Sequence, residues 1–291
     1  MKIGVTTSNY FMYSGAEKGF ALMKRDGWEV CDYSSISETA SPLFELTDSE
    51  FERHMLKDAE AARNAGIEIY QTHGPWRWPP RDGTAEERAE RFEKMSKDLH
   101  ATKLLGAKYM VIHPIMPWGW GKPPCEQEYM DLNLEYYSRL TKVAEQEDVV
   151  IALENMPMPE LPLGSPKQII DFVKQIESPY LRVCLDTGHA AVITQNPTPV
   201  ALRAAEGVQV TGKEYLRCLH IHDNDGVRDC HWLPYFGVTD FNAFAKALKE
   251  IEYDGPITLE CGVGGNEFMP DALKEQYMKT LAATARLLAN A

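Results

Sequence analysis

The chain has 291 residues, 44% of them hydrophobic and 25% charged, and its formal net charge is −13. This composition is ordinary for a globular protein, and a chain of this length can bury a large core. The acidic balance and the lack of a basic run argue against a nucleic-acid partner, because proteins that bind nucleic acids gain much of their affinity from contacts of Lys and Arg with phosphates.

Eight short apolar segments along the chain predict β-strands. They are rich in Ile, Val, Leu, Tyr and Cys, and polar and apolar residues mostly do not alternate in them, which is typical of parallel strands covered on both faces. In chain order they are approximately 2–6, 28–32, 67–72, 108–113, 149–154, 181–186, 216–222 and 256–260.

Longer, charge-rich segments with helical spacing lie between the predicted strands. The clearest is 84–105, where Thr84 and Glu87 have the spacing of a capping box and Gly106 is placed to end the helix. The segment 47–65 repeats this pattern. The other predicted helices are approximately 15–26, 126–147, 166–176, 198–206, 240–250 and 270–290.

The alternation of strand and helix predicts an α/β fold, a closed parallel (β/α)₈ or TIM barrel, as a single domain over residues 1–291. A doubly wound open sheet is the alternative. A nucleotide-binding sheet of that kind would need a glycine-rich turn after its first strand, and residues 7–15 (TSNYFMYSG) do not supply one.

Seven of the predicted strands end in a polar residue of a kind that binds metals or substrates. These residues are Asp32, His73, His113, Glu154, Asp186, His220 and Glu260. A buried strand has no local need for such a group at its last position. The pattern makes sense if the strand ends converge, as they do at the C-terminal mouth of a parallel barrel.

The loops after three of these strands are rich in proline, tryptophan and glycine. They read HGPWRWPP (73–80), HPIMPWGWGKPP (113–124) and ENMPMPELPLG (154–164). Stiff loops with aromatic faces are a common wall for a small-molecule pocket, so we expect Trp76, Trp78, Trp118 and Trp120 to form one. The alternative is that they only cover the barrel rim.

Glu154, Asp186, His220 and Glu260 would face one another from the last four strands. Three carboxylates and one imidazole suit a divalent ion such as Mn²⁺, Zn²⁺, Co²⁺ or Mg²⁺. Without an ion the carboxylates would repel and one would have to take up a proton. The alternative is a set of unconnected strand caps and salt-bridge partners.

No segment approaches the length of a membrane span, and MKIGVTTSNY lacks the apolar core of a signal peptide. None of the six cysteines forms a C-x-x-C pair, and Cys184, Cys218 and Cys261 lie in or beside apolar runs. They are expected to be small buried thiols in a reducing compartment, so we predict a cytoplasmic protein with no membrane partner.

Five motifs in barrel order resemble the xylose-isomerase-like barrel superfamily. They are ALENMP (152–157), CLDTGH (184–189), HIHDNDG (220–226), DCH (229–231) and LECG (259–262). This superfamily contains sugar-phosphate isomerases, epimerases of the tagatose 3-epimerase kind and the apurinic-site endonucleases, so the resemblance does not choose a reaction.

The epimerase resemblance implies that Glu154, Asp186, His220 and Glu260 hold one catalytic metal, that Glu154 and Glu260 are also the acid/base pair, and that His189 binds a substrate oxygen. The expected protein is a metal-dependent sugar or sugar-phosphate isomerase or epimerase. It would work by proton transfer through an enediolate on a small carbohydrate. A homo-oligomer is left open.

The endonuclease resemblance implies a multi-zinc phosphodiesterase instead. There His73, His113 and Glu154 would hold one zinc, the four strand-end ligands a second, and His189, Asp229 and His231 a third. His222 stands where those endonucleases usually carry Asn. A third alternative is a barrel that binds a sugar without converting it.

Two smaller features bear on the substrate. The loop CGVGGN (261–266) either offers backbone N–H groups to a phosphate or simply makes a turn. Arg228 either holds a sugar hydroxyl or phosphate or is solvated.

Overall fold

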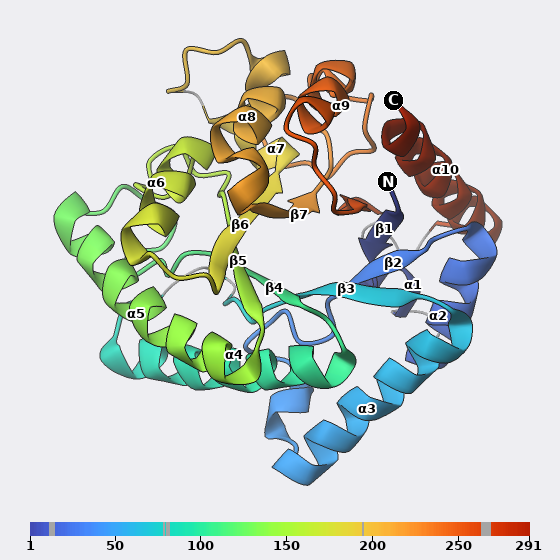
Figure 1. Ribbon diagram of the computed structural model, residues 1–291, viewed down its shortest axis with the longest axis horizontal. Coiled ribbons are helices and arrows are strands. Elements are labelled where there is room, and N and C mark those ends of the chain that lie inside the picture. Colours follow the sequence, from blue (N-terminus) through green and yellow to red (C-terminus); the bar gives the residue numbers. More distant parts are fainter. Residues whose placement is uncertain (12–14, 78, 80–81, 194, 263–268) are drawn as a thin grey trace.

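The computed structural model describes residues 1–11, 15–77, 79, 82–193, 195–262 and 269–291. Eight parallel strands form one sheet in the order β7-β6-β5-β4-β3-β2-β1-β8, with helices around it (Figure 1). The strands are β1 (Ile3–Thr6), β2 (Val30–Tyr33), β3 (Glu68–His73), β4 (Tyr109–Ile112), β5 (Val150–Glu154), β6 (Leu181–Asp186), β7 (Leu216–His220) and β8 (Ile257–Leu259).

The sheet closes on itself at the seam between β7 and β8. Ile221, directly after β7, forms a parallel bridge with Leu259, and its N–H donates to the Thr258 carbonyl at 3.0 Å. Glu260 N–H in turn donates to the Ile221 carbonyl at 3.1 Å. The predicted (β/α)₈ barrel is therefore confirmed.

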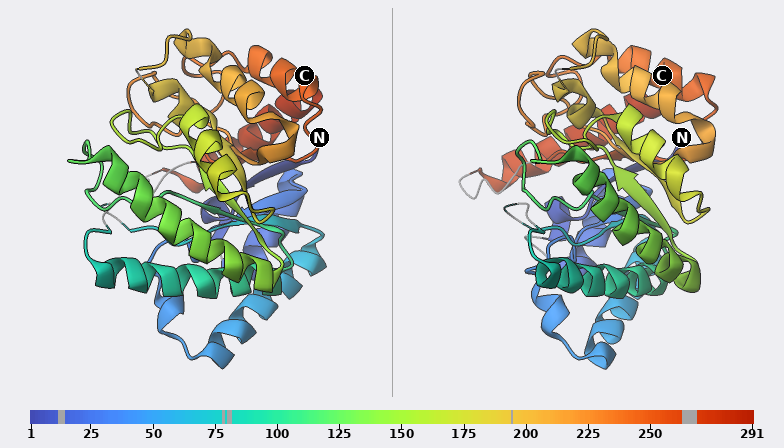
Figure 2. Two further views of the ribbon diagram at one scale, coloured as in Figure 1. Left: turned by 60° about the vertical axis from the view of Figure 1, so that its left-hand side comes forward. Right: turned by 90° about the vertical axis from the view of Figure 1, so that its left-hand side faces the viewer.

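One long helix follows each strand and packs on the outside of the barrel (Figure 2). These helices are α2 (Gly15–Asp26), α3 (Asp48–Ala65), α4 (Ala85–Leu105), α5 (Glu126–Glu147), α6 (Pro166–Ile176), α8 (Arg203–Tyr215), α9 (Phe241–Glu250) and α10 (Asp271–Asn290). The predicted capping boxes of α3 and α4 are both present, and Gly66 and Gly106 end those helices in the left-handed conformation.

Three short elements were not predicted. They are α1 (Ser8–Phe11), η1 (Pro42–Glu45) and α7 (Thr187–Val192). The helix predicted at 198–206 differs in its bounds, because η2 (Val200–Leu202) occupies its start and α8 continues to Tyr215. Glycine has a low helix propensity, but Gly207 lets α8 pack closely on Leu185 of β6, where a Cβ would lie 2.8 Å from that side chain.

The apolar core lies mainly between the strands and the helices. Inside the barrel a small cluster of Val111, Ala152, Cys184 and Cys218 fills the space below the polar strand ends. Cys184, Cys218 and Cys261 are buried and unpaired, as predicted. Among the described residues no helix has both the length and the apolar character needed to cross a membrane.

Candidate active site and metal centre

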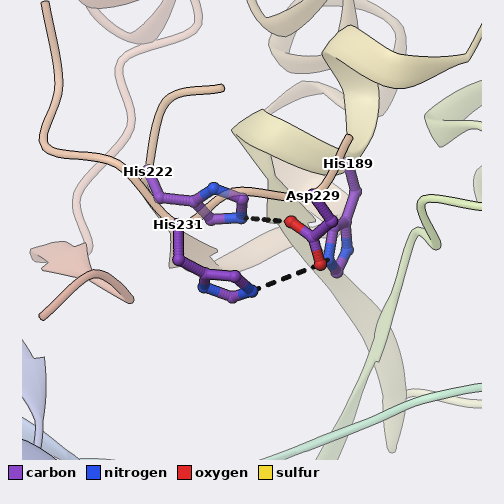
Figure 3. Close-up of side chains that lie close together, drawn as sticks. All are labelled: His189, His222, Asp229 and His231. Carbon is purple, nitrogen blue, oxygen red and sulfur yellow. Dashed lines mark hydrogen bonds and ion pairs between the residues drawn. The ribbon is translucent and has the colours of Figure 1, made fainter. Parts of the chain in front are cut away.

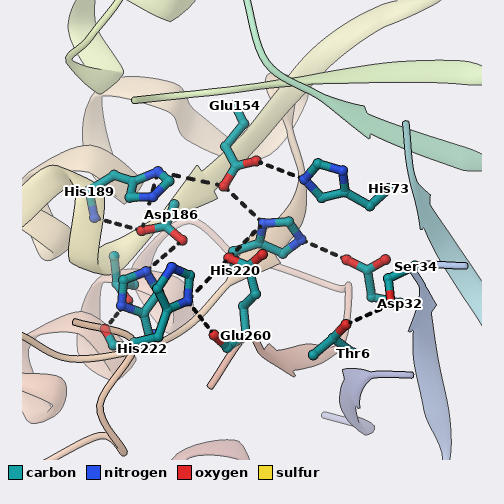
Figure 4. A network of polar contacts seen from close by, with 12 residues as sticks. Thr6, Asp32, Ser34, His73, Glu154, Asp186, His189, His220, His222 and Glu260 are labelled. Carbon is teal, nitrogen blue, oxygen red and sulfur yellow. Dashed lines mark hydrogen bonds and ion pairs between the residues drawn. The ribbon is translucent and has the colours of Figure 1, made fainter. Parts of the chain in front are cut away.

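The polar strand ends converge at the C-terminal mouth of the barrel (Figure 4). Glu154 ends β5, Asp186 ends β6 and His220 ends β7, while Glu260 directly follows β8. One ligand atom from each lies within 4.8 Å of the others. His220 Nδ1 is 2.9 Å from Glu154 Oε1 and 3.3 Å from Glu260 Oε2. We call these four residues the carboxylate centre.

The charges in the carboxylate centre shift one another's pKa strongly. Burial would raise the pKa of Glu154, but His220, His113 and His73 hold it well below its ordinary value. Burial would lower the pKa of His220, but Glu260, Glu154 and a hydrogen bond to Asp32 raise it well above the ordinary value. Glu154 and His220 therefore favour their charged forms, whereas burial raises the pKa of Glu260 above its ordinary value.

The donor set fits a divalent cation. Among the described residues, one buried carboxylate oxygen on each of Glu154, Asp186 and Glu260 has no well-aligned hydrogen-bond donor, although a histidine nitrogen lies within 3.3 Å of each. Unsatisfied buried polar atoms are costly, and native proteins satisfy them with a partner, a water or an ion. Three carboxylates and one imidazole are the ligand types expected around Mn²⁺, Co²⁺, Zn²⁺ or Mg²⁺.

His73 and His113 lie beside Glu154 Oε2, whereas His220 lies beside Glu154 Oε1. His113 Nε2 is 3.1 Å from Glu154 Oε2, and His73 Nε2 is 3.7 Å from the same atom. Burial lowers the pKa of His113 to about 4, which favours the neutral imidazole. Only the neutral form has a lone pair that can bind a metal or accept a hydrogen bond. The predicted group of His73, His113 and Glu154 is thus assembled.

The loop that carries His113 is held by a buried ion pair. Arg91 of α4 binds Asp82 Oδ2 through Nη1 at 2.5 Å and donates to the His113 carbonyl through Nη2 at 3.1 Å. Asp82 Oδ2 also accepts from the Met116 N–H at 3.0 Å. A well-bonded buried pair of this kind fixes the rim loops, and removing one partner would leave the other charge unpaired.

A second group of ligand types, which we call the imidazole cluster, lies beside the carboxylate centre (Figure 3). It consists of His189, His222, Asp229 and His231. Asp229 Oδ2 is 3.3 Å from His189 Nε2 and 3.2 Å from His231 Nε2, and Asp229 Oδ1 is 3.6 Å from His222 Nε2. His189 is on α7, and the other three residues follow β7.

His222 was not predicted as a site residue, although it belongs to the imidazole cluster. It is fully buried, and its ring stacks on His231 with centroids 4.1 Å apart. Within the described part of the chain, neither ring nitrogen has a well-aligned hydrogen-bond partner. Its spacing of two residues from His220 was the available signal, because alternate residues of an extended segment point the same way.

Asp186 joins the two groups. Its Oδ1 accepts from the His189 N–H at 2.6 Å and so caps α7, while its Oδ2 lies 3.0 Å from His222 Nε2. The pKa of Asp186 is lowered, because His189 and His222 outweigh the effect of burial. The residue that ends β6 therefore fixes the start of the helix that carries His189.

A cavity of about 640 Å³ opens beside the carboxylate centre on the side of β1 and β2. Glu260, His73, His231 and Asp32 reach its wall. Much of the remaining wall consists of hydroxyl and amide side chains, namely Thr6, Ser8, Asn9, Ser34, Ser35, Ser37 and Ser41. Such a lining offers many hydrogen bonds to a polar molecule of small size.

The predicted aromatic wall is realised only in part. Trp76 lines the cavity and lies edge-on to His113, with ring centroids 5.3 Å apart. Trp118 packs near Tyr129 of α5 and does not line the cavity, and Trp120 is 45% exposed. Trp78 lies outside the described residues.

The two smaller features are placed as follows. Arg228 forms an exposed ion pair with Asp225 at 2.8 Å and does not line the cavity. Cys261 and Gly262 line the cavity, whereas residues 263–266 of the glycine loop lie outside the described residues.

In (β/α)₈ barrels the active site lies at the C-terminal face. The carboxylates and imidazoles of this barrel are gathered at that face. The chain belongs to the xylose isomerase-like TIM barrel family, whose profile matches residues 26–284. The resemblance found in the five motifs is thereby confirmed.

Individual relatives include a protein without an assigned activity and a probable nuclease. An uncharacterised protein of Methanocaldococcus jannaschii is 33% identical over 174 residues, which cover 59% of this chain and 55% of that protein. A probable endonuclease 4 of Mycoplasma mobile is 27% identical over 171 residues, which cover 56% of this chain and 59% of that protein. The chain thus matches little more than half the length of these relatives.

Among solved structures, a D-psicose 3-epimerase crystallised in the presence of D-fructose matches with a TM-score of 0.77 over 100% of both chains. Its sequence identity is 15%, so this likeness shows the fold alone.

Proposed function

We propose that the protein is a metal-dependent isomerase or epimerase of a small carbohydrate. The observation that carries the proposal is the carboxylate centre, which opens on a cavity lined by hydroxyl side chains. A sugar presents the matching hydroxyl and carbonyl oxygens. The fold shared with a D-psicose 3-epimerase supports the same reading.

In this proposal Glu154, Asp186, His220 and Glu260 hold one divalent ion. The ion, when bound, acts as a Lewis acid toward the substrate's carbonyl and a neighbouring hydroxyl. Glu260 reaches the cavity wall and retains 23% exposure of its side chain, whereas the Glu154 side chain is 1% exposed. Glu260 would therefore contact a bound sugar at the cavity wall, and Glu154 would lie deeper in the barrel mouth.

The chemistry assigned to the two glutamates is proton transfer. One removes the proton from the carbon next to the carbonyl, which leaves an enediolate, and the other returns a proton. Return to the opposite face of the same carbon gives an epimer. If the deprotonated carbon is the terminal one, return of the proton to the former carbonyl carbon, with transfer of the hydroxyl proton between the two oxygens, converts a ketose to an aldose. His189 and the other members of the imidazole cluster would bind substrate oxygens or a further ion.

Deuterium wash-in tests the proposal. Metal-loaded protein incubated in D₂O with a panel of ketoses should incorporate deuterium beside the carbonyl of the true substrate, as followed by NMR or mass spectrometry. The matched control is Asp98→Asn, which alters a fully buried carboxyl of α4 that belongs to neither group of ligands and should keep exchange. Absence of bound metal in the wild-type protein after titration would overturn the proposal.

A second candidate is a multi-metal phosphodiesterase that cuts abasic DNA. The observation that favours it is the assembly of all three ligand groups implied by the endonuclease resemblance, together with the probable endonuclease 4 among the relatives. Against it stands the net charge of −13. A nicking assay on an abasic duplex at low salt decides, and efficient metal-dependent cleavage would establish this candidate in place of the first.

A further inference from the structure

Asp32 reaches across the barrel mouth from β2 to His220 on β7, a contact between residues 188 positions apart in the chain (Figure 4). The two atoms are Asp32 Oδ2 and His220 Nε2, and they are 2.7 Å apart. Both side chains are buried, with exposures of 2% and 0%. This nitrogen points away from the carboxylate centre.

The contact decides which nitrogen of His220 is free to bind an ion. A neutral imidazole has one N–H and one lone pair, on different nitrogens. The Asp32 carboxylate can only accept, so it holds the proton on Nε2. The lone pair then lies on Nδ1, which faces Glu154 Oε1 at 2.9 Å and Glu260 Oε2 at 3.3 Å.

Several features hold Asp32 and the His220 ring in this arrangement. The pairing of β2 with β3 shifts its register between Cys31 and Asp32, and such bulges re-aim side chains near active sites. Gln71 of β3 donates to the same Asp32 Oδ2 at 2.9 Å. The His73 ring stacks on the His220 ring with an interplanar angle of 7°. These contacts leave the imidazole little freedom to turn.

We propose that Asp32 is a positioning residue that orients His220 and fixes its tautomer, so that Nδ1 serves as the imidazole ligand of the carboxylate centre. The inference rests on the proposed function, because it requires that the centre binds an ion. Carboxylate partners of this kind are common behind metal-binding histidines and change metal affinity by roughly 10- to 100-fold.

The experiment titrates the metal-free chain of residues 1–291 with Mn²⁺, which suits an oxygen-rich site. Free Mn²⁺ is followed by electron paramagnetic resonance, and electron spin echo modulation from nitrogen reports the bound histidine. Asp32→Asn keeps an oxygen that can accept from Nε2 and should weaken binding about 10-fold. Asp32→Ala removes the acceptor and should weaken binding roughly 100-fold, with loss of the nitrogen signal.

Asp58→Asn is the matched control. Asp58 is also buried, at 5% exposure, and accepts from the hydroxyl of Tyr33 on β2 at 2.7 Å, but it belongs to α3 and to neither group of ligands at the mouth. Asp58→Asn should lower the free energy of unfolding but leave the affinity for Mn²⁺ unchanged. Equal loss of affinity in Asp58→Asn and Asp32→Asn would overturn the inference, since it would indicate a general effect of a damaged β2.

The outcomes separate the inference from the proposed function. Wild-type protein that binds no Mn²⁺ contradicts the proposed function itself. Wild-type binding with unchanged affinity and nitrogen signal in folded Asp32→Ala overturns the inference alone. If the Asp32 variants do not fold, Gln71→Met removes only the donor that steadies Asp32. It should then weaken binding a few-fold, and unchanged binding would again overturn the inference.

Discussion

The carboxylate centre and the imidazole cluster are neighbours with opposite compositions. The first combines three carboxylates with one imidazole, and the second combines three imidazoles with one carboxylate. Oxygen-rich sites suit Mg²⁺ and Mn²⁺, whereas imidazole suits Zn²⁺ and other transition metals. We infer that the two groups of ligands differ in the ions they favour and in the chemistry they support.

The two regions also differ in how the fold supports them. Three members of the carboxylate centre end barrel strands, so the hydrogen-bonded sheet fixes their backbones. The imidazole cluster is built from α7 and the segment after β7, and His231 holds a positive φ of 48° with its side chain 40% exposed. A site on strands is more rigid than a site on loops. In the proposed function, catalysis therefore belongs to the first region and an accessory role to the second.

The largest effect is expected from Glu154→Gln. Glu154 contacts His220, His113 and His73, and its replacement removes a ligand, an acid/base group and the charge that those imidazoles face. Turnover should fall by roughly 10⁴-fold, the upper end of acid–base effects. Metal analysis should show lower occupancy, and Asp186→Asn should lower it as well.

The prediction for Glu154 has a clear negative outcome. If Glu154→Gln keeps the wild-type metal content while Asp98→Asn behaves in the same way, then Glu154 is a structural residue. The carboxylate centre would then have no claim to be the metal-binding region of the two.

A smaller loss is expected from Glu260→Gln. The amide keeps an oxygen for the ion and a similar shape but cannot transfer the proton. Turnover should fall by roughly 10²-fold while much of the metal is retained. The measurement pairs steady-state kinetics with metal content. Near-normal turnover with full metal would make Glu260 a ligand only and would contradict a mechanism with two proton-transfer groups.

The barrel and its mouth were predictable because both follow from local patterns. Apolar runs that end in Glu154, Asp186 and His220 indicate strands, and parallel strands bring their ends together. Thr84 and Glu87 predicted the start of α4 because a capping box is a contact between residues three apart.

Features that depend on distant contacts were not predictable in the same way. Asp32 was visible as a strand end, but its partner His220 is 188 positions away, and only the closed barrel brings them together. His222 follows β7 in a segment whose path is set by the bridge between Asp223 and Trp232. The limits of α8 depend on packing against β6, which overrides the low helix propensity of Gly207.

As the pH rises, the stability of the metal-free protein should fall, whereas its affinity for a metal ion should rise. The pKa of His220 is raised above its model-peptide value of 6.5, because Glu260 and Glu154 outweigh burial. The stability it contributes is therefore fully present below pH 6.5 and is lost as the pH rises through the folded-state pKa. Binding of an ion requires that proton to leave, so affinity should rise by up to about tenfold per pH unit.

Thermal unfolding at about pH 6 and about pH 8.5, with and without Mn²⁺, checks the two signs. The metal-free protein should unfold at a lower temperature at the higher pH, and Mn²⁺ should then give the larger stabilisation. Asp58→Asn serves as the control and should show the same pattern. A metal-induced stabilisation that is larger at the lower pH would contradict the assignment of His220 as a ligand.

The smallest effect is expected from His222→Asn, and it tests whether the two regions act separately. His222 Nε2 lies 3.6 Å from Asp229 Oδ1 and 3.0 Å from Asp186 Oδ2, so it stands between them. The substitution leaves His189, Asp229 and His231 in place. We expect Zn²⁺ affinity of the imidazole cluster to fall about 10-fold, a typical effect of losing a supporting group at a metal site.

Competition with a chromophoric chelator measures that Zn²⁺ affinity after Mn²⁺ has filled the carboxylate centre. Turnover on the true sugar should stay within about two-fold of wild type, because Asp186 keeps its bond to the His189 N–H. His100→Asn, at a histidine 37% exposed on α4, is the matched control. A parallel loss of Mn²⁺ affinity in His222→Asn would show that Asp186 couples the regions into one polynuclear site, which is the arrangement that favours the phosphodiesterase candidate.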